Sequence, residues 1–177
     1  MKKINYYVAS SIDGYISGIN GDISGFDGKG NGVDKYLEDL KKFETVIMGR
    51  NTYEFGYKYG LVPGKPAYPH MDHYIFSETL HFENPDEKVK VKKIDLNEIS
   101  IIKKKSKTDI YLCGGGIFAG WLLDNQLIDV LTIKVNPLVL GQGVKIFGES
   151  TKSFRLNLTG KETYEEGLLI NTYEVKY

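Results

Sequence analysis

The sequence predicts an α/β fold with a mainly parallel sheet and an antiparallel edge. Short apolar runs, typical of buried strands, alternate with segments of helical periodicity along most of the chain, and strand patterns alone finish it. Such alternation is typical of β-α-β units, in which a helix connects two parallel strands. Because 177 residues suit one hydrophobic core, we expect a single domain over residues 1–177.

The first half of the chain predicts strands and helices around a glycine-rich loop. Six glycines with Asp and Asn between them mark residues 18–32 as a mobile loop, long enough to be functional. Helical spacing of apolar residues predicts a helix over Val33–Phe43, and a shorter helix is expected over Tyr53–Tyr59. The strands are the apolar runs Ile4–Ser10, Thr45–Met48 and His73–Ser77.

The second half predicts further strand and helix pairs and a terminal hairpin. Asp95 as an N-cap, with Glu98 three residues later, predicts a variant capping box that opens a helix to about Lys105. The segment Glu165-Glu166-Gly167 supplies the hairpin turn. The strands expected here are Val89–Ile94, Ile110–Cys113, Val130–Leu140 (interrupted by Pro137), Phe154–Tyr164 and Leu168–Lys176.

Three consecutive glycines, Gly114, Gly115 and Gly116, stand between the apolar run Ile110–Cys113 and an amphipathic segment that begins near Phe118. Glycines let the backbone approach a ligand closely, and the first N–H groups of a helix are free to bind an anion. This layout predicts a phosphate-binding site and hence a nucleotide cofactor. The alternative is that the glycines only permit tight packing of strand against helix.

The spacing of these glycines argues against a standard Rossmann site. With Gly120 as the third glycine, the run misses the G-x-G-x-x-G spacing by one position. The acidic residue expected about 20 residues after the first glycine should end the next strand. Here Asp129 stands before that strand.

A second segment, Gly49-Arg50-Asn51-Thr52, repeats the order of strand, glycine and polar helix start. Arg50 offers a planar, permanently charged donor that suits a phosphate, and Thr52 adds a hydroxyl. Two phosphate-competent strand ends in one sheet fit a dinucleotide that lies across the carboxyl edge of the strands. The alternative is an ordinary helix start beside a surface arginine.

Two acidic segments give weaker predictions. Asp13-Gly14 ends the first strand with a turn and a carboxylate that is either structural or directed at a substrate. Residues 27–32, together with Glu38, resemble a calcium loop, but Lys29 occupies a position where an oxygen ligand is needed. We therefore reject calcium.

The histidines and the cysteine do not predict a metal site. His70 and His73 flank a Pro-rich loop, and neither they nor His81 have a nearby cysteine to complete a zinc set. Cys113 lies inside an apolar strand, where a buried inert thiol is expected.

Composition excludes several classes of function. The formal net charge is zero, with 23 basic and 23 acidic residues, so there is no bulk electrostatic case for nucleic acid or an anionic membrane. No apolar run approaches the roughly 20 residues of a membrane helix, and the N-terminus lacks the apolar core of a signal peptide. A single cysteine excludes an internal disulfide, and we expect a cytoplasmic location.

Taken together, these segments resemble the dihydrofolate reductase-like superfamily. Within it, the sequence is most similar to the reductase domain of riboflavin biosynthesis and its small stand-alone bacterial relatives. The matching segments are VASSIDGYISG, IMGRNTYE, HYIFS and CGGGIFAGWLLDNQLIDVLTIKVNPLVLGQGVKIF, of which the last is the most specific.

The resemblance implies a three-layer α/β/α fold and NADPH as the hydride donor. It implies that Gly49, Arg50 and Thr52 bind the cofactor phosphates and that Ser77 lies near the adenosine 2′-phosphate. It also implies that Ala9 and Ile16 line the nicotinamide pocket, over which the glycine-rich loop closes. The pyrophosphate would be wrapped by Gly114, Gly115, Gly116, Ile117 and Phe118.

The substrate side of the resemblance is less complete. Folate reductases place a carboxylate in the first helix, and Asp34 lies near that place. Asp13 and Asp34 are therefore our candidates for substrate contact or proton delivery. The chain has only one other arginine besides Arg50, Arg155, which argues against a phosphorylated ribose substrate unless a lysine substitutes.

The sequence therefore predicts an NADPH-dependent reductase of a small nitrogen heterocycle, of pterin or aminopyrimidinedione type, or of a related carbonyl or imine. One alternative is a non-catalytic nucleotide- or pterin-binding protein of the same fold, and another is a structural domain without a ligand. A homodimer is expected by analogy, with terminal strands such as Leu168–Val175 as a pairing edge.

Overall fold

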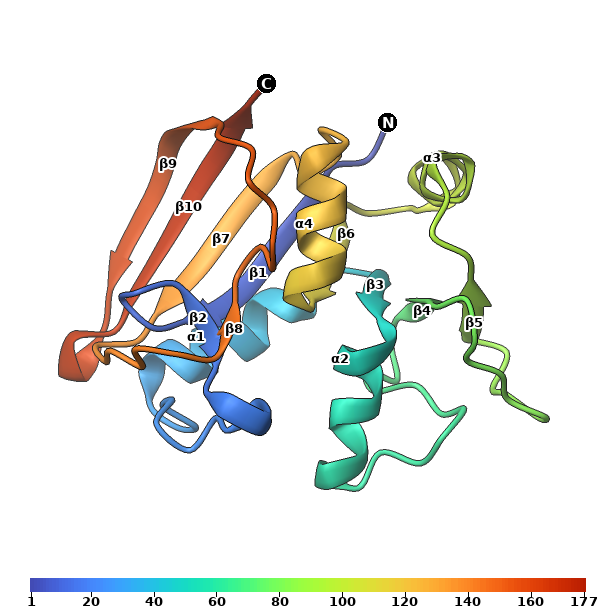
Figure 1. Ribbon diagram of the computed structural model, residues 1–177, viewed down its shortest axis with the longest axis horizontal. Coiled ribbons are helices and arrows are strands. Elements are labelled where there is room, and N and C mark those ends of the chain that lie inside the picture. Colours follow the sequence, from blue (N-terminus) through green and yellow to red (C-terminus); the bar gives the residue numbers. More distant parts are fainter.

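The fold is built on one large sheet. The computed structural model describes all 177 residues and contains an eight-stranded sheet in the order β5-β4-β3-β6-β1-β7-β10-β9 (Figure 1). A separate two-stranded sheet pairs β2 (Tyr15–Ser17) with β8 (Val144–Lys145). The strands of the large sheet are β1 (Ile4–Ser10), β3 (Thr45–Gly49), β4 (Asp72–Phe76), β5 (Val89–Lys92), β6 (Ile110–Gly114), β7 (Val130–Val135), β9 (Arg155–Thr163) and β10 (Leu169–Lys176).

The strand directions confirm the predicted mainly parallel sheet with an antiparallel edge. The six strands from β5 to β7 run parallel to their neighbours, whereas β10 runs antiparallel to both β7 and β9. Parallel strands covered on both faces need nearly continuous apolar sequence. The central strand β1, with the sequence INYYVAS, meets this need, because most of its side chains are buried.

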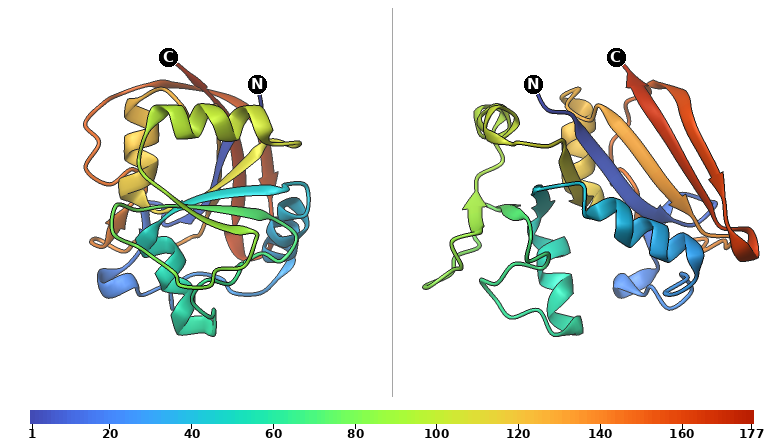
Figure 2. Two further views of the ribbon diagram at one scale, coloured as in Figure 1. Left: turned by 90° about the vertical axis from the view of Figure 1, so that its right-hand side faces the viewer. Right: turned by 180° about the vertical axis from the view of Figure 1, so that it is seen from behind.

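Helices on both faces complete the three layers. One face is covered by α1 (Asn31–Leu40), and the other by α3 (Leu96–Lys105) and α4 (Gly116–Asp124) (Figures 1 and 2). From the end of β3, α2 (Arg50–Phe55) continues into the 3-10 turn η2 (Gly56–Tyr59). Two further 3-10 turns are η1 (Ile19–Gly21) and η3 (Glu165–Gly167).

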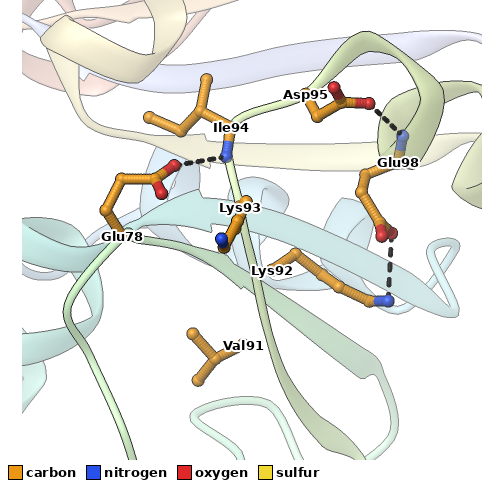
Figure 3. A pocket seen from close by; sticks show the side chains of 7 residues that line it. All are labelled: Glu78, Val91, Lys92, Lys93, Ile94, Asp95 and Glu98. Carbon is orange, nitrogen blue, oxygen red and sulfur yellow. Dashed lines mark hydrogen bonds and ion pairs between the residues drawn. The ribbon is translucent and has the colours of Figure 1, made fainter.

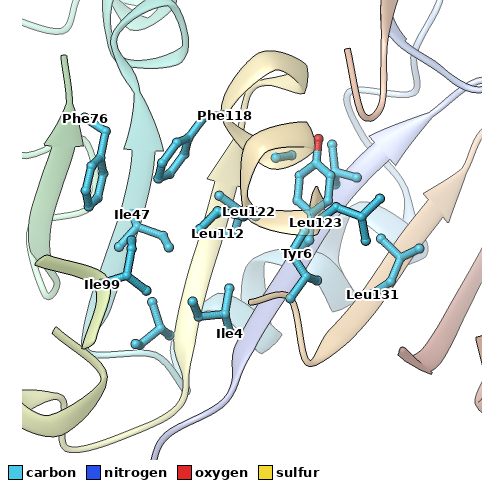
Figure 4. Packing of buried hydrophobic residues seen from close by; sticks show 14 of the residues in the cluster. Ile4, Tyr6, Ile47, Phe76, Ile99, Leu112, Phe118, Leu122, Leu123 and Leu131 are labelled. Atoms are coloured by element: carbon cyan, nitrogen blue, oxygen red, sulfur yellow. The ribbon is translucent and has the colours of Figure 1, made fainter. Parts of the chain in front are cut away.

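Two apolar clusters, one on each face of the sheet, hold the layers together. The larger cluster joins α3 and α4 to the sheet through side chains such as Ile99, Phe118 and Leu122 (Figure 4). The cluster on the α1 face is rich in tyrosine and includes Tyr7 and Tyr111. Each large apolar side chain that is fully buried stabilises the fold by about 1.5–3 kcal/mol, so the two clusters fix the strand ends on which a site would be built.

Local differences from the sequence-based expectations have identifiable causes. The strand expected over Val130–Leu140 ends at Val135, because the chain turns at Asn136 and Pro137. The pairing of β2 with β8 was not predicted, since strands of three and two residues carry no periodic signal. Asp95 caps α3 as predicted, whereas the Glu98 carboxylate forms an ion pair with Lys92 at 3.0 Å.

None of the helices combines the length and the apolar composition needed to cross a lipid bilayer.

Candidate functional site

The order of the strands reverses around β6, which places the carboxyl ends of β3 and β6 side by side. From β1 the chain passes to β3, β4 and β5, and it then returns to insert β6 between β3 and β1. Open α/β sheets bind ligands outside the carboxyl ends of the strands at such switch points. The two glycine-containing segments singled out in the sequence follow these two strands.

The turn between β6 and α4 packs closely against its surroundings. Gly114 has a φ of +125°, which favours glycine, and a cis peptide bond joins it to Gly115. A Cβ on Gly115 would lie 2.9 Å from the Thr52 Oγ1, and a Cβ on Gly116 would lie 2.1 Å from the Lys145 carbonyl oxygen. The glycines therefore do permit tight packing: Gly114 and Gly116 are buried, and Gly115 is partly exposed.

The two predicted phosphate-binding segments meet at this turn. Thr52 lies against Gly115, and a Cβ on Gly49 would lie 3.3 Å from the Phe118 Cβ. No side chain caps α2 or α4, because glycine occupies both N-cap positions. The N–H groups of residues 116–118 have no acceptor within α4, and such N–H groups favour an anion.

The first side chains of α4 have separate environments. Ile117 is 74% exposed at the helix start, next to the free N–H groups. Phe118 is buried and stacks between Phe76 and Trp121, with ring centroids 4.6 and 6.2 Å away. Among the five residues predicted to wrap a pyrophosphate, Ile117 is accessible, and Phe118 supports the turn from within the core.

Arg50 and Ser77 are linked through the turn that follows β4. The Arg50 guanidinium donates to Glu54 Oε1 at 2.9 Å and to Thr79 Oγ1 at 2.8 Å. The Ser77 Oγ accepts hydrogen bonds from the backbone N–H groups of Thr79 and Leu80, at 3.2 and 3.0 Å. Ser77 thus shapes the turn, and Arg50 spans the space from α2 to it.

A cavity of about 470 Å³ lies beyond this turn, at the ends of β4 and β5 (Figure 3). Its charges are mixed: Lys92 is paired with Glu98, and the Ile94 N–H donates to Glu78 Oε1 at 3.3 Å. Lys93 is exposed and forms no ion pair. The cavity is lined by Glu78, Val91, Lys92, Lys93, Ile94, Asp95 and Glu98.

The two residues predicted to line a nicotinamide pocket lie on adjacent elements. Ala9 is half-buried at the carboxyl end of β1, where it pairs with Lys134 of β7. Ile16 lies in β2 and packs at the margin of the larger apolar cluster. Both are therefore near the carboxyl edge of the sheet.

The structure places the two candidate carboxylates in different roles. Asp13 accepts hydrogen bonds from the backbone N–H groups of Leu140 and Gly141, at 3.1 and 2.7 Å, and so joins two loops. Hydrogen bonds from the Ser11 side chain and from these backbone groups lower the pKa of Asp13 to about 2, which makes it a poor proton donor. Asp34 is exposed in the first turn of α1 and forms no ion pair.

Sequence reasoning missed two buried polar residues at the end of β7. Asn136 accepts a hydrogen bond from the Asp27 N–H at 3.1 Å and donates to the Ser10 carbonyl oxygen at 3.3 Å. The Lys134 Nζ donates to the Asp27 carbonyl oxygen at 3.4 Å. These contacts anchor the glycine-rich loop to the sheet. The signal in the sequence was a single charged residue, Lys134, within a mainly apolar strand.

Comparison with known proteins finds relatives along the whole chain. The sequence pattern of the RibD C-terminal domain matches residues 2–170. The uncharacterized protein YwjB of Bacillus subtilis (strain 168) is 28% identical over 178 residues, which cover 96% of this chain and 97% of that protein. The uncharacterized protein YyaP of the same strain is 24% identical over 183 residues, which cover 97% and 94%.

Solved structures share the fold. A putative riboflavin biosynthesis protein from Shewanella sp. PV-4 has a TM-score of 0.81 and 25% identity, with both chains covered completely. Dihydrofolate reductase from Enterococcus faecalis, complexed with NADP(H), has a TM-score of 0.67 at 16% identity and covers 99% of this chain and 97% of its own. These similarities confirm the predicted three-layer, dihydrofolate reductase-like fold.

Proposed function

The chain belongs to the RibD C-terminal domain family, and on that premise we propose that it is an NADPH-dependent reductase. The acceptor would be a small nitrogen heterocycle of pterin or aminopyrimidinedione type, or a related carbonyl or imine. The observation that carries the proposal is the meeting of Thr52 and Gly115 beside the uncapped start of α4. Two helix starts that converge on one point suit the two phosphates of a dinucleotide.

The residues at this edge fit the phosphates of NADPH. The glycine turn from Gly114 to Gly116, in which Gly115 is partly exposed, and the N–H groups that begin α4 would hold the pyrophosphate, with the Thr52 hydroxyl beside it. Arg50 would exchange its contact with Thr79 for a phosphate, because a bidentate charged contact is stronger than one to a hydroxyl.

The adenosine end would lie at the turn after β4. Ser77 and Arg50 meet at this turn, and the unpaired Lys93 lines the adjoining cavity (Figure 3). Positive side chains favour a 2′-phosphate and hence NADPH. Glu78 lines the same cavity and opposes that preference, so a comparison with NADH belongs in any binding experiment.

When bound, the nicotinamide supplies the hydride, and the protein must orient the acceptor, exclude water and provide a proton. Of the two candidate carboxylates, Asp34 is the one available for substrate contact, since the low pKa of Asp13 and its loop contacts commit that group to structure.

Binding of NADPH to the ligand-free chain is the direct test of the cofactor assignment. A ligand at 100 times its Kd stabilises a fold by about 2.7 kcal/mol, which corresponds to roughly 5–10 °C in Tm for a chain of this size. We expect a shift of that order with NADPH, measured by differential scanning calorimetry. No shift would leave only the structural domain without a ligand.

Turnover separates the reductase from a binding protein of the same fold. The measurement is the loss of NADPH absorbance with pterin and aminopyrimidinedione acceptors. Binding without oxidation on any acceptor would favour the non-catalytic alternative. We also propose a homodimer. The segment Leu168–Val175, expected to supply the pairing edge, is not an edge, because β10 pairs with both β7 and β9. We therefore propose β9, which is exposed along nearly its whole length, as the pairing edge.

A further inference from the structure

Lys134 is a buried lysine without a carboxylate partner. The residue is 6% exposed, and its Nζ makes one hydrogen bond, at 3.4 Å, to the Asp27 carbonyl oxygen. Lys103, whose side chain is similarly covered, instead forms an ion pair with Asp129 at 2.8 Å. Lys134 is therefore unusual among the covered lysines of this chain.

An ammonium group in this position has unused binding capacity. It carries three donors, and removing its charge from water is costly unless a partner compensates. Besides the carbonyl oxygen of Asp27, the Tyr36 ring, 5.6 Å from Nζ, provides a favourable electrostatic contact. Burial lowers the pKa of Lys134, and the charge of the Asp27 carboxylate, which forms no ion pair with Nζ, opposes that shift. A ligand with a negatively charged oxygen would supply the missing partner.

Lys134 lies where the acceptor of the proposed reaction is expected. It pairs directly with Ala9, which is predicted to line the nicotinamide pocket, and it lies on the face of the sheet that α1 covers (Figure 2). Tyr36 and Cys113 are only half-buried on this face. The Tyr36 hydroxyl is hydrogen-bonded to the Tyr111 hydroxyl at 2.7 Å, and aromatic rings of this kind suit a planar heterocycle.

On the basis of the proposed function, we propose that Lys134 binds the acceptor oxygen that becomes negatively charged as hydride adds. The acceptor class is then a planar nitrogen heterocycle with a ring carbonyl attached to a reducible C=C bond or to the nitrogen of a reducible C=N bond. Asp27 of the glycine-rich loop contacts both Asn136 and Lys134 and so covers the lysine. The glycine-rich loop is therefore the segment that would move when the acceptor enters.

The reaction step balances within this arrangement. A bound NADPH would supply the hydride that forms a C–H bond at the far carbon of the double bond, and the π electron pair would move through the conjugated atoms to the carbonyl oxygen. The Lys134 ammonium donates a proton to that oxygen and becomes a neutral amine. The amine then recovers a proton from water.

Barbiturate and uracil test the charge preference without the cofactor. Barbiturate is a pyrimidine ring enolate at neutral pH, and uracil is a neutral ring of the same size. A charge-assisted hydrogen bond predicts about tenfold or greater preference for barbiturate in the full chain, measured by isothermal titration calorimetry. Equal affinity for the two rings, or no binding of barbiturate, would overturn the assignment.

Two methionine variants locate the preference. Lys134→Met keeps a long unbranched side chain, and we expect it to lose the preference for barbiturate while its melting temperature is unchanged or raised. Lys90→Met is the matched control. The Lys90 Nζ also lies near a tyrosine ring, 5.1 Å from that of Tyr74, but Lys90 is on β5, at the end of the sheet order far from β7. Retained preference in Lys134→Met would contradict the proposal.

A measurement on the unaltered chain covers the case in which Lys134→Met does not fold. Barbiturate affinity should fall as the pH rises through the pKa of Lys134, whereas the affinity of 1,3-dimethyluracil, a neutral ring without an ionisable N–H, should stay constant over the same range. A constant barbiturate affinity would overturn the proposal. Because these assays contain no dinucleotide, failure to bind NADPH would count against the reductase assignment without altering their result.

Discussion

Individual side chains at the carboxyl edge divide into those that hold the protein together and those that are free for a ligand. The side-chain oxygens of Asp13, Asn136 and Ser77 accept hydrogen bonds from backbone N–H groups of neighbouring loops and turns. Arg50 instead contacts two side chains on the surface, and such contacts contribute little to stability. Replacing Arg50 should therefore affect cofactor binding while it leaves the stability of the fold nearly unchanged.

We predict that Arg50→Met weakens NADPH binding by about 10- to 100-fold, because a charged hydrogen bond contributes about 1.5–3 kcal/mol. Its melting temperature should hardly change. Arg155→Met is the matched control, since Arg155 is exposed on β9 and is the only other arginine. Fluorescence titration with NADPH measures both; equal affinities would show that Arg50 does not contact the cofactor.

His73 predicts the response of the fold to acid. It is fully buried, its Nε2 accepts a hydrogen bond from the Tyr68 N–H, and burial lowers its pKa to about 4. The unfolded chain therefore binds a proton between about pH 6.5 and 4 that the folded chain does not, so stability falls as the pH falls through this window.

The loss attributable to His73 is on the order of 3 kcal/mol. His73→Gln keeps an acceptor for Tyr68 and cannot titrate, and we expect a flatter dependence of the unfolding free energy on pH. Urea denaturation at several pH values measures it. His81→Gln, at an exposed position, is the control and should leave the slope unchanged.

At the level of elements, α3 shows how a short sequence pattern determines a boundary. The Asp95 carboxylate accepts hydrogen bonds from the N–H groups of Asn97 and Glu98, at 2.7 and 3.4 Å. We predict that Asp95→Ala lowers the free energy of unfolding by about 1 kcal/mol. Asp95→Asn should retain most of the stability because it retains the cap. Chemical denaturation distinguishes the two variants, and equal losses would mean that the cap contributes nothing.

The elements that sequence predicted well depend on local patterns. Apolar runs predicted β1, β3 and β6, and consecutive glycines predicted the start of α4. These predictions succeed because burial of a strand and conformational freedom of a turn depend on residues that are neighbours in the sequence. The reductase-like fold followed from the same segments. The cofactor residues remain a prediction, although Thr52 and Gly115 do lie together.

What sequence did not predict depends on contacts between distant residues. Asn136 and Lys134 are buried by the glycine-rich loop, which lies more than a hundred positions earlier in the chain. The loop position of Asp13 likewise depends on Leu140 and Gly141. Periodicity carries no information about such pairs. The residues around the expected substrate site therefore follow from the positions of the loops on the sheet and not from the sequence pattern.

At the scale of the whole molecule, the sheet ends in a strand that a single chain leaves uncovered. β9 pairs only with β10, and its other edge has free backbone groups. Leu156 and Leu158 lie on the same face of this strand, at 45% and 52% exposure. They stand opposite Val175 and Tyr173, which belong to the larger cluster or pack against it, so the apolar face continues beyond the part that α4 covers.

We predict that a second copy of the chain covers this face. Exposed edge strands pair readily, and burying apolar surface stabilises association by about 25 cal/mol per Å². Leu158→Lys places a charge in the contact and should convert a dimer to a monomer in sedimentation velocity. Leu37→Lys, at an equally exposed leucine on α1, should leave the dimer intact. Since none of the proposed cofactor residues lies on β9, a monomeric Leu158→Lys chain should still bind NADPH. A wild-type chain that stays monomeric at high concentration would show that β9 is not an interface.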